Sequence, residues 1–270
     1  MSKNKINRTG EINVSNEGCV MKIVEYNNAK DIIIEFQDEH KYRLHTNYQA
    51  FKNGRCKNPF FASVYEHGYL GIDKEGNEPK THESKDGKYV ATWGYSKWIG
   101  MLQRCFYDKL KERQPTYKDV TCCDRWLCFA NFLEDLEVLK QEYSWNEDEK
   151  LNLDKDILNK NNKIYSLENC ILVPDYINFL FLKNDAIRGQ YPIGVSYDKR
   201  KKKYQAYCSV NGKQIRIGRY NTVEEAFNVY KIVKENEIKR IANDCVSKGF
   251  ISEDSRLYNA MISYQIGIDD

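Results

Sequence analysis

Histidine and long apolar runs are both scarce in this sequence. It contains four histidines, and none follows His82. The longest apolar run, at residues 171–182, is too short to cross a bilayer and contains Asp175 and Asn178. The first ten residues, MSKNKINRTG, lack the apolar core of a signal peptide. We therefore expect a soluble, cytoplasmic protein with no membrane partner.

A Cys-x-x-Cys pair is also absent, although the chain contains nine cysteines. The closest approach to such a pair is Cys122-Cys123 followed by Cys128. Without the pair, and without histidine beyond His82, a structural zinc site is poorly supported. In a reducing cytosol the cysteines are expected to be buried thiols and not disulfides.

The composition is that of folded modules. The 270 residues are 41% hydrophobic and include 20 Tyr and 11 Phe, which leaves room for two or three domains with their own cores. We predict an α+β protein. Its expected segments are a β-rich module at 1–72, an irregular linker at 73–91, a mixed domain at 92–185, a basic module at 186–245, and a helix with an acidic tail at 246–270.

Local patterns predict the elements within these segments. After a polar lead-in over residues 1–18, the runs VMKIVEY, DIIIEF and KYRLHT predict antiparallel strands, with turns at Asn27-Asn28 and Asp38-Glu39. Apolar residues at helical spacing predict helices from about Thr92 and about Asp124. Residues 152–182 predict strand, loop, strand and helix, with Pro174 in the first helical turn.

The basic module is predicted to be three strands and a long helix. Alternation turns Tyr204, Ala206, Cys208 and Val210 to one face of the middle strand, and the last strand turns Ile215 and Ile217 to the same side. Asn211-Gly212 predicts a tight hairpin turn, because both residues tolerate positive φ. Asn221-Thr222 predicts a helix cap, followed by an apolar stripe that can cover the inner face of the sheet.

The charge of this module differs from that of the rest. Residues 187–243 contain 13 Lys and Arg against five acidic residues, a net charge of +8, whereas the whole chain carries +3. A basic module on a slightly acidic body is typical of nucleic-acid-binding proteins. The simpler alternative for residues 199–203 is a solvated run of charge.

Four motifs add to this interpretation: Gly194-Val195, Tyr204 to Tyr207, Ile217 to Tyr220, and Thr222 to Ala226. Over about fifty residues they resemble the plant ethylene-response-factor (Apetala-two) DNA-binding domain, whose three-stranded sheet enters the major groove. The resemblance implies double-stranded DNA as partner. Base preference does not carry over, because the segment has no Trp. The implied contacts are Ser196, Lys199, Arg200, Lys201, Lys202, Lys203, Gln205, Tyr207, Ser209, Gln214 and Arg216.

A second set of motifs lies upstream. It comprises Trp98 to Cys105, Tyr117 to Trp126, Leu153 to Asp156, and Tyr165 to Cys170. Over residues 93–182 it resembles phage-type HNH endonucleases, which implies a ββα-metal fold, Mg²⁺ or another divalent ion, and phosphodiester hydrolysis. Such proteins commonly carry an Apetala-two module at the C-terminal side. The resemblance places Asp154 and Asn178 on the metal, and Asn169 in a role that pins the loop.

The sequence departs from the HNH pattern at the general base, where Lys155 stands in place of histidine. Lysine is charged near neutral pH and is a poor base. Lys155 could hold phosphate, while Asp156, His67 or His82 could activate water. The alternatives are a DNA-binding regulator that no longer cuts, a phage factor that inhibits a host protein, and a module that binds an acidic protein or RNA.

Overall fold

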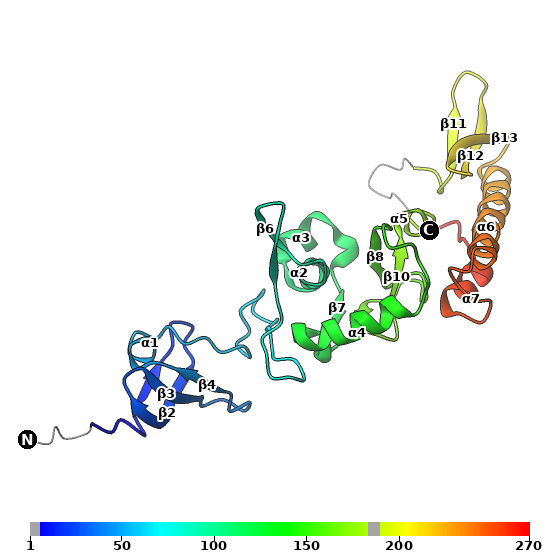
Figure 1. Cartoon of the computed structure of the whole chain (residues 1–270). Coiled ribbons are helices and arrows are strands. Elements are labelled where there is room, and N and C mark those ends of the chain that lie inside the picture. The colour runs from blue at the N-terminus through cyan, green and yellow to red at the C-terminus, as the bar shows by residue number, and fades with distance from the viewer. Residues whose placement is uncertain (1–5, 183–189) are drawn as a thin grey trace, which may run out of the picture. The chain divides into compact units, whose positions relative to one another are not determined.

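The computed structural model describes residues 6–182 and 190–270, which form a mixed α and β protein (Figure 1). The chain divides into two compact units, Met1–Asp135 and Leu136–Asp270. The predicted boundary between residues 185 and 186 lies outside the described residues. Within the described parts, no helix is long and apolar enough to span a lipid bilayer.

The first unit begins with a four-stranded antiparallel sheet in chain order. The strands and the short helix after them are β1 (Ile12–Val14), β2 (Val20–Asn28), β3 (Asp31–Phe36), β4 (Arg43–Thr46) and α1 (Tyr48–Lys52). Alternate residues of β2 and β3 are buried, among them Ile23 and Ile34, and Phe51 of α1 packs on them. The three predicted strands are confirmed.

Three local expectations for this sheet were wrong. β1 lies inside the segment expected to be a polar lead-in. β2 runs through Asn27 and Asn28, and the chain turns at residues 29–30 instead. The helix α1 lies in a stretch expected to be strand.

A hairpin occupies the segment expected to be an irregular linker. Its strands are β5 (His82–Lys85) and β6 (Lys88–Ala91), joined by Asp86-Gly87. These two residues have φ of 50° and 72°. An Asp-Gly pair is a strong hairpin signal for that reason, and the charge-rich surroundings concealed it.

The first helix predicted for the first unit is confirmed, whereas the second, expected from about Asp124, begins at Phe129 after a short 3₁₀ turn. Thr92 caps α2 (Trp93–Phe106), and the predicted stripe of Trp98, Met101, Leu102 and Cys105 is buried. The remaining elements are α3 (Asp108–Arg113), η1 (Pro115–Tyr117), β7 (Thr121–Cys122), η2 (Asp124–Leu127) and α4 (Phe129–Gln141), within which the second unit begins. All nine cysteines are free thiols, and seven of them are buried.

The second unit begins with a strand pair and a very short helix. β8 (Leu151–Asp154) pairs antiparallel with β10 (Ile171–Pro174), and α5 (Asp175–Asn178) follows directly. β9 (Ile164–Tyr165) lies in the connection between the two strands. Pro174 ends β10 and caps α5, so its predicted place in the helical turn was wrong by one residue.

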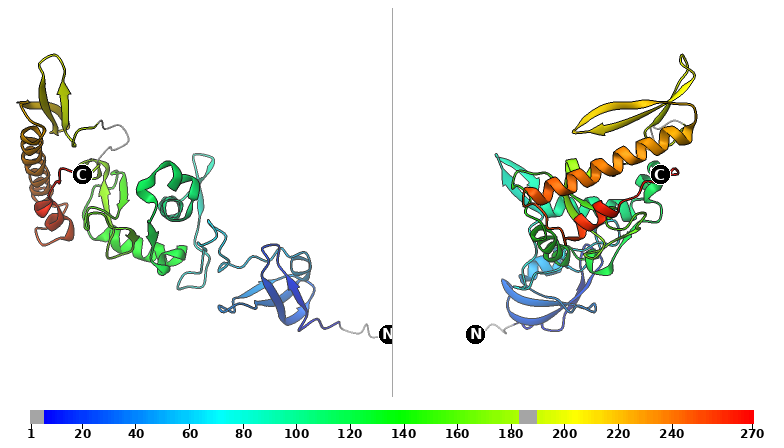
Figure 2. Two further views of the ribbon diagram at one scale, coloured as in Figure 1. Left: turned by 180° about the vertical axis from the view of Figure 1, so that it is seen from behind. Right: turned by 90° about the vertical axis from the view of Figure 1, so that its right-hand side faces the viewer.

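A three-stranded sheet and two helices complete the unit. They are β11 (Val195–Asp198), β12 (Lys203–Val210), β13 (Lys213–Tyr220), α6 (Val223–Ser247) and α7 (Arg256–Ser263). Figure 2 shows α6 running along the sheet and onward to α7. The first half of α6 packs on the sheet through Ala226, Phe227 and Tyr230. Its second half packs through Ile238 and Ala242 into the core that includes Val173 of β10.

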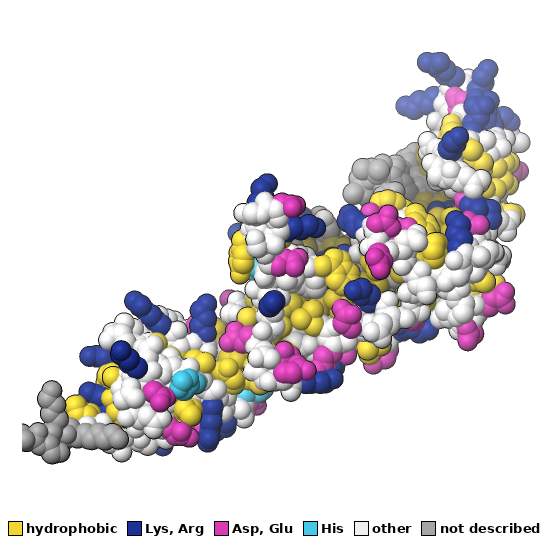
Figure 3. Space-filling view, in the orientation of Figure 1, with side chains coloured by type: hydrophobic (Ala, Val, Ile, Leu, Met, Phe, Trp, Pro, Cys, Tyr) yellow, Lys and Arg dark blue, Asp and Glu magenta, His cyan; other side chains and the backbone are white. Residues whose placement is uncertain are grey.

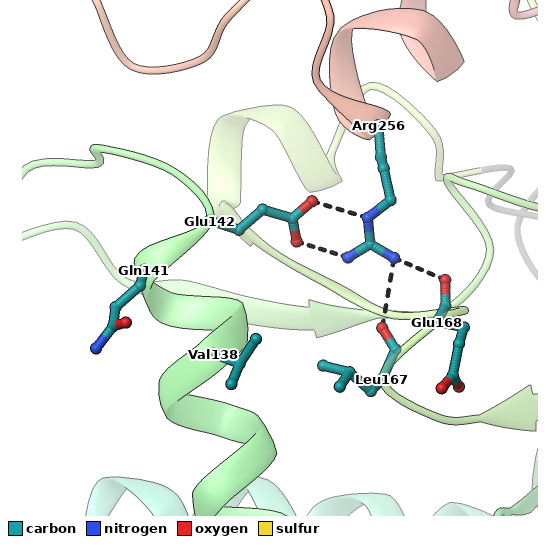
Figure 4. Close-up of a pocket in the computed structure, with 6 residues that line it drawn as sticks. All are labelled: Val138, Gln141, Glu142, Leu167, Glu168 and Arg256. Carbon is teal, nitrogen blue, oxygen red and sulfur yellow. Dashed lines mark hydrogen bonds and ion pairs between the residues drawn. The ribbon is translucent and has the colours of Figure 1, made fainter.

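Arg256 ties three parts of the second unit together (Figure 4). Its Nε and Nη2 donate to Glu142 Oε1 and Oε2 at 2.8 and 2.6 Å. Its Nη1 donates to the carbonyl oxygen of Glu168 at 2.7 Å. These bonds fix α7 to the end of α4 and to the loop before β10, which holds the β8–β10 region against α6 and α7.

Candidate nucleic-acid interface and the Asp154 region

The inner face of the β11–β13 sheet is closed by α6, which leaves the other face to solvent. Ala206 and Cys208 are buried against the helix, as the alternation predicted. Gly194 has a φ of 76°, and a Cβ there would lie 2.1 Å from the Tyr230 ring. The predicted helix cap is present at Thr222, and Thr222 and Glu225 exchange hydrogen bonds at the start of α6 as a capping box. The sheet is therefore a rigid support for its outer face.

The outer face carries polar side chains in cross-strand pairs. Pairing places residues of all three strands on one surface: Ser196 opposite Gln205, Tyr207 opposite Arg216, and Ser209 opposite Gln214. Ser196, Tyr207 and Gln214 also line a shallow hollow on this surface. Six of the residues predicted to contact DNA thus share one face.

A turn rich in cations stands at one end of this face. Asp198 Oδ1 accepts hydrogen bonds from the backbone N–H groups of Arg200 and Lys201 at 3.0 and 3.2 Å. This Asx turn presents the side chains at 199–202, which are all exposed. Within the described parts of the chain, none of these four forms an ion pair. Figure 3 shows Lys and Arg side chains gathered over this end of the sheet.

A β-bulge changes which side of β13 reaches the outer face. Tyr207 pairs with Arg216 and Ala206 pairs with Gly218, so Ile217 is the extra residue. Ile217 still packs on the core. Beyond the bulge, Arg219 pairs with Gln205 and therefore lies on the outer face. Strict alternation would have turned Arg219 inward, and the sequence prediction missed it for that reason.

A hydrogen-bonded network crosses the outer face. The Tyr207 hydroxyl donates to Gln205 Oε1, and Gln205 Nε2 donates to Asp198 Oδ2 at 2.5 Å. Arg219 Nε lies 3.4 Å from the same Asp198 oxygen. The backbone N–H of Lys201, together with that of Arg200 and the Arg219 guanidinium, holds the pKa of Asp198 below its ordinary value.

Two of the predicted contact residues have other roles in this arrangement. Gln205 is only 8% exposed, and its amide is used within the network, so it orients its neighbours. Lys203 is half-buried and donates to Asn221 Oδ1 at the start of α6. Arg216, Gln214 and Ser209 are exposed, and Tyr207 is half-buried.

Asp154 ends β8, where it caps a turn much as Asp198 does. Its Oδ1 accepts from the backbone N–H groups of Asp156 and Ile157, both at 2.8 Å. Asp154 keeps some exposed surface, but protein atoms enclose its carboxylate, and this burial raises its pKa despite the two backbone donors. The residue predicted to bind a metal is thus engaged in a local turn.

Lys155 is buried, with 5% of its surface exposed. Its Nζ donates to both carboxylate oxygens of Asp156 at 2.7 and 2.8 Å and to the carbonyl oxygen of Asn162 at 2.7 Å. An ammonium group has three N–H donors, so all of them are used. Asn162 returns a hydrogen bond to the carbonyl oxygen of Lys155 at 3.0 Å, which closes the loop after β8. The Nζ of Lys155 is thus occupied by protein acceptors in closing this loop.

Asn169 precedes β10, and Asn178 follows it in α5. Asn169 Oδ1 accepts from Asn159 Nδ2 at 3.2 Å, a bond that links two parts of the connection between β8 and β10. Asn178 is the last residue of α5.

The side chains near Asp154 do not fit a divalent ion. Over residues 6–182 and 190–270, no three His, Cys, Asp or Glu side chains come together as a metal-binding group. One Asp154 oxygen serves the turn, and the Asp156 carboxylate is paired with the Lys155 ammonium. Mg²⁺ requires an octahedral set of oxygen ligands, and the buried ammonium of Lys155 beside the Asp156 carboxylate opposes a second cation.

The histidines suggested as replacement bases belong to the first unit. His67 stacks on Phe106 with ring centroids 4.1 Å apart, and His82 stacks on Tyr89 at 5.0 Å. His82 Nδ1 also lies 3.0 Å from Thr81 Oγ1. Both rings are thus in aromatic packing within their own unit.

Comparison with known proteins does not identify a relative of this chain. No family model, curated protein or solved structure matches the chain.

Proposed function

We propose that this protein binds double-stranded DNA through the outer face of the β11–β13 sheet. The observation that carries the proposal is the contrast between the two faces of that sheet. One is sealed by α6, and the other presents Arg216, Arg219, Gln214 and the exposed turn at 199–202. Cations of this kind neutralise phosphates, whereas arginine and glutamine can pair with base edges.

The roles divide along the sheet. The turn at 199–202 consists of lysine and arginine without described ion-pair partners, which suits contact with the phosphate backbone. Arg216 and Gln214 lie toward the Asn211-Gly212 end of the face, next to Tyr207 and Ser209. A sheet of this width presents them together to the major groove, which is wide enough for β-strands. These residues are among the contacts that the Apetala-two resemblance implies.

β8, β10 and α5 follow one another as strand, strand and helix. This is the order of the ββα fold that the HNH resemblance implies. The chemistry at its centre supports a scaffolding role, since Lys155 closes a loop and Asp154 caps a turn. We therefore propose that the β8–β10–α5 region is a scaffold for a DNA-binding protein and does not cleave DNA at Asp154.

Duplex binding by the purified full chain tests the proposal. Binding to a 30-base-pair duplex should be salt-dependent, with the logarithm of affinity falling linearly with the logarithm of salt concentration. Single-stranded DNA, duplex RNA and a polyglutamate chain serve as competitors. Efficient displacement by RNA or polyglutamate, with weak displacement by unlabelled duplex, would assign the basic face to another partner.

A further inference from the structure

We infer that Arg219 reads a guanine in the major groove and that Asp198 positions it for this contact. The inference deepens the proposed DNA binding and rests on it. It adds a specific base contact to a face on which the cations of the 199–202 turn suit phosphate.

The bulge gives Arg219 its place. Arg216 pairs with Tyr207 and Arg219 pairs with Gln205, two residues farther along β12. The two arginines therefore stand roughly 7 Å apart along the same face. That spacing corresponds to about two base-pair steps of B-DNA, so both side chains can reach base edges from one docked sheet.

The contact with Asp198 leaves the two terminal nitrogens of Arg219 available as hydrogen-bond donors. The pairing is through Nε, at 3.4 Å from Asp198 Oδ2. A guanidinium has five N–H donors, and four of them are on the two terminal nitrogens. No described residue takes a hydrogen bond from these terminal nitrogens, so the guanidinium still offers paired donors to a ligand.

Asp198 is itself fixed. One of its oxygens caps the turn through two backbone N–H groups, and the other accepts from Gln205 at 2.5 Å. Gln205 is buried and is held by the Tyr207 hydroxyl. The carboxylate thus orients Arg219 from a position that the sheet determines.

The same carboxylate selects the kind of group that Arg219 can contact. A phosphate held by the Arg219 guanidinium would also meet the negative charge of Asp198 beside it, whereas the neutral edge of a base would not. Guanine presents N7 and O6 as two acceptors side by side, which arginine contacts in a bidentate manner. Lysine, a single compact charge, cannot reproduce that geometry.

Selection from a random duplex pool, followed by binding assays on the selected sequence, tests this role. The variants are Arg219→Lys, Arg219→Ala and Asp198→Asn, the last of which keeps an oxygen to cap the turn. Arg240→Lys is the matched control, because Arg240 also pairs through Nε with a carboxylate, that of Glu237, but on α6. Thermal unfolding checks that each variant is folded.

The wild-type protein should prefer guanine at one position, and replacing that base by 7-deazaguanine should weaken binding. Arg219→Lys should lower the preference by roughly 5- to 150-fold, with an unchanged salt dependence and no further response to 7-deazaguanine. Asp198→Asn should give a smaller loss of preference, whereas Arg240→Lys should give none. These are effects on selectivity, which a purely structural role would not produce.

Two results would overturn the inference, and they differ. Salt-dependent duplex binding in which Arg219→Lys keeps the full guanine preference would overturn the role of Arg219 alone. Absence of duplex binding by the wild-type protein would overturn the proposed function, and this role with it.

Discussion

Asp154 and Asp198 build the same turn in two different surroundings. Each ends a strand of an antiparallel pair, and each accepts hydrogen bonds from the backbone N–H groups two and three residues later. In both cases a lysine follows directly. Burial raises the pKa of Asp154, whereas the backbone N–H of Lys201 lowers that of Asp198. Lys155 is buried with every donor used, and Lys199 is exposed.

This difference shows that the same local sequence pattern can engage a lysine within the fold or leave it exposed to solvent. The distinction depends on the acceptors that surround the cation. At Lys155 these are Asp156 and the carbonyl oxygen of Asn162, so the positive charge is neutralised within the fold. At the 199–202 turn the charge remains available to a polyanion. The two lysines therefore differ in how many donors they leave for a ligand, although their local sequences are alike.

The largest expected effect separates these two roles directly. Replacing Lys199, Arg200, Lys201 and Lys202 together by alanine should weaken duplex binding by roughly ten- to thousandfold near 0.1 M salt and lower the salt slope by up to about 3.5. Fluorescence anisotropy over a salt series measures both quantities.

The matched control replaces four exposed lysines of the first unit with alanine: Lys22, Lys30, Lys52 and Lys57. It should leave the affinity within about threefold and lower the slope by less than 1. Equal losses in the two variants would mean that binding follows overall charge and that the turn has no special role.

The second effect concerns folding. Lys155→Met keeps the apolar stem but removes the ammonium, so three charge-assisted hydrogen bonds are lost. We expect the free energy of unfolding to fall by about 1.5–3 kcal/mol, because the remaining Asp156 carboxylate can still reach water. Urea unfolding measures this change, with the exposed Lys140→Met as control. An unchanged midpoint would show that the loop after β8 closes without Lys155.

Local signals in the sequence were sufficient for most of the β11–β13 sheet. Alternation in β12, the Asn211-Gly212 turn and the Thr222 cap depend only on neighbouring residues, and all three are confirmed. The same is true of the buried stripe on α2. The Asp86-Gly87 hairpin was also readable, but its charge-rich flanks gave no alternation to support it.

The features that were missed depend on contacts across the chain. The bulge at Ile217 arises from pairing with β12, so the outward position of Arg219 could not be read from β13 alone. Lys155 is buried because Asn162 and Asp156 converge on it, and the spacing of a motif does not report that convergence. The sequence therefore showed the likeness to a catalytic motif but not the hydrogen bonds in which the motif residues are engaged.

The third effect is a difference in pH dependence between the two aspartates. A carboxyl with a raised pKa costs stability as pH rises above the ordinary aspartate range, because the buried charge must form. Asp154→Asn keeps the capping oxygen and removes that charge, so the variant should be at least as stable as wild type at pH 7. The two should converge at acid pH, where Asp154 is protonated.

Asp198 should behave in the opposite way. Its pKa is lowered, so its contribution to stability is present at neutral pH and is lost as pH falls through the lowered value. Asp198→Asn should therefore be the less stable protein at pH 7, with the difference shrinking in acid. Thermal unfolding from pH 3 to pH 8 measures both series. Parallel curves for the two variants would show that the environments of the two carboxylates do not differ as described.

The smallest expected effect is that of divalent ions at Asp154. Adding 5 mM Mg²⁺ or Mn²⁺ should leave the unfolding temperature unchanged, since binding to the folded state alone would raise it. Plasmid DNA incubated with the protein and either ion should stay supercoiled. The controls are Asp154→Asn and the double variant Asp154→Ala with Asn178→Ala. Nicking by the wild type that disappears in the double variant would break the comparison, because Asp154 would then hold a catalytic ion that its turn and Lys155 argue against. Nicking that persists in the double variant would place cleavage elsewhere and leave Asp154 as a capping residue.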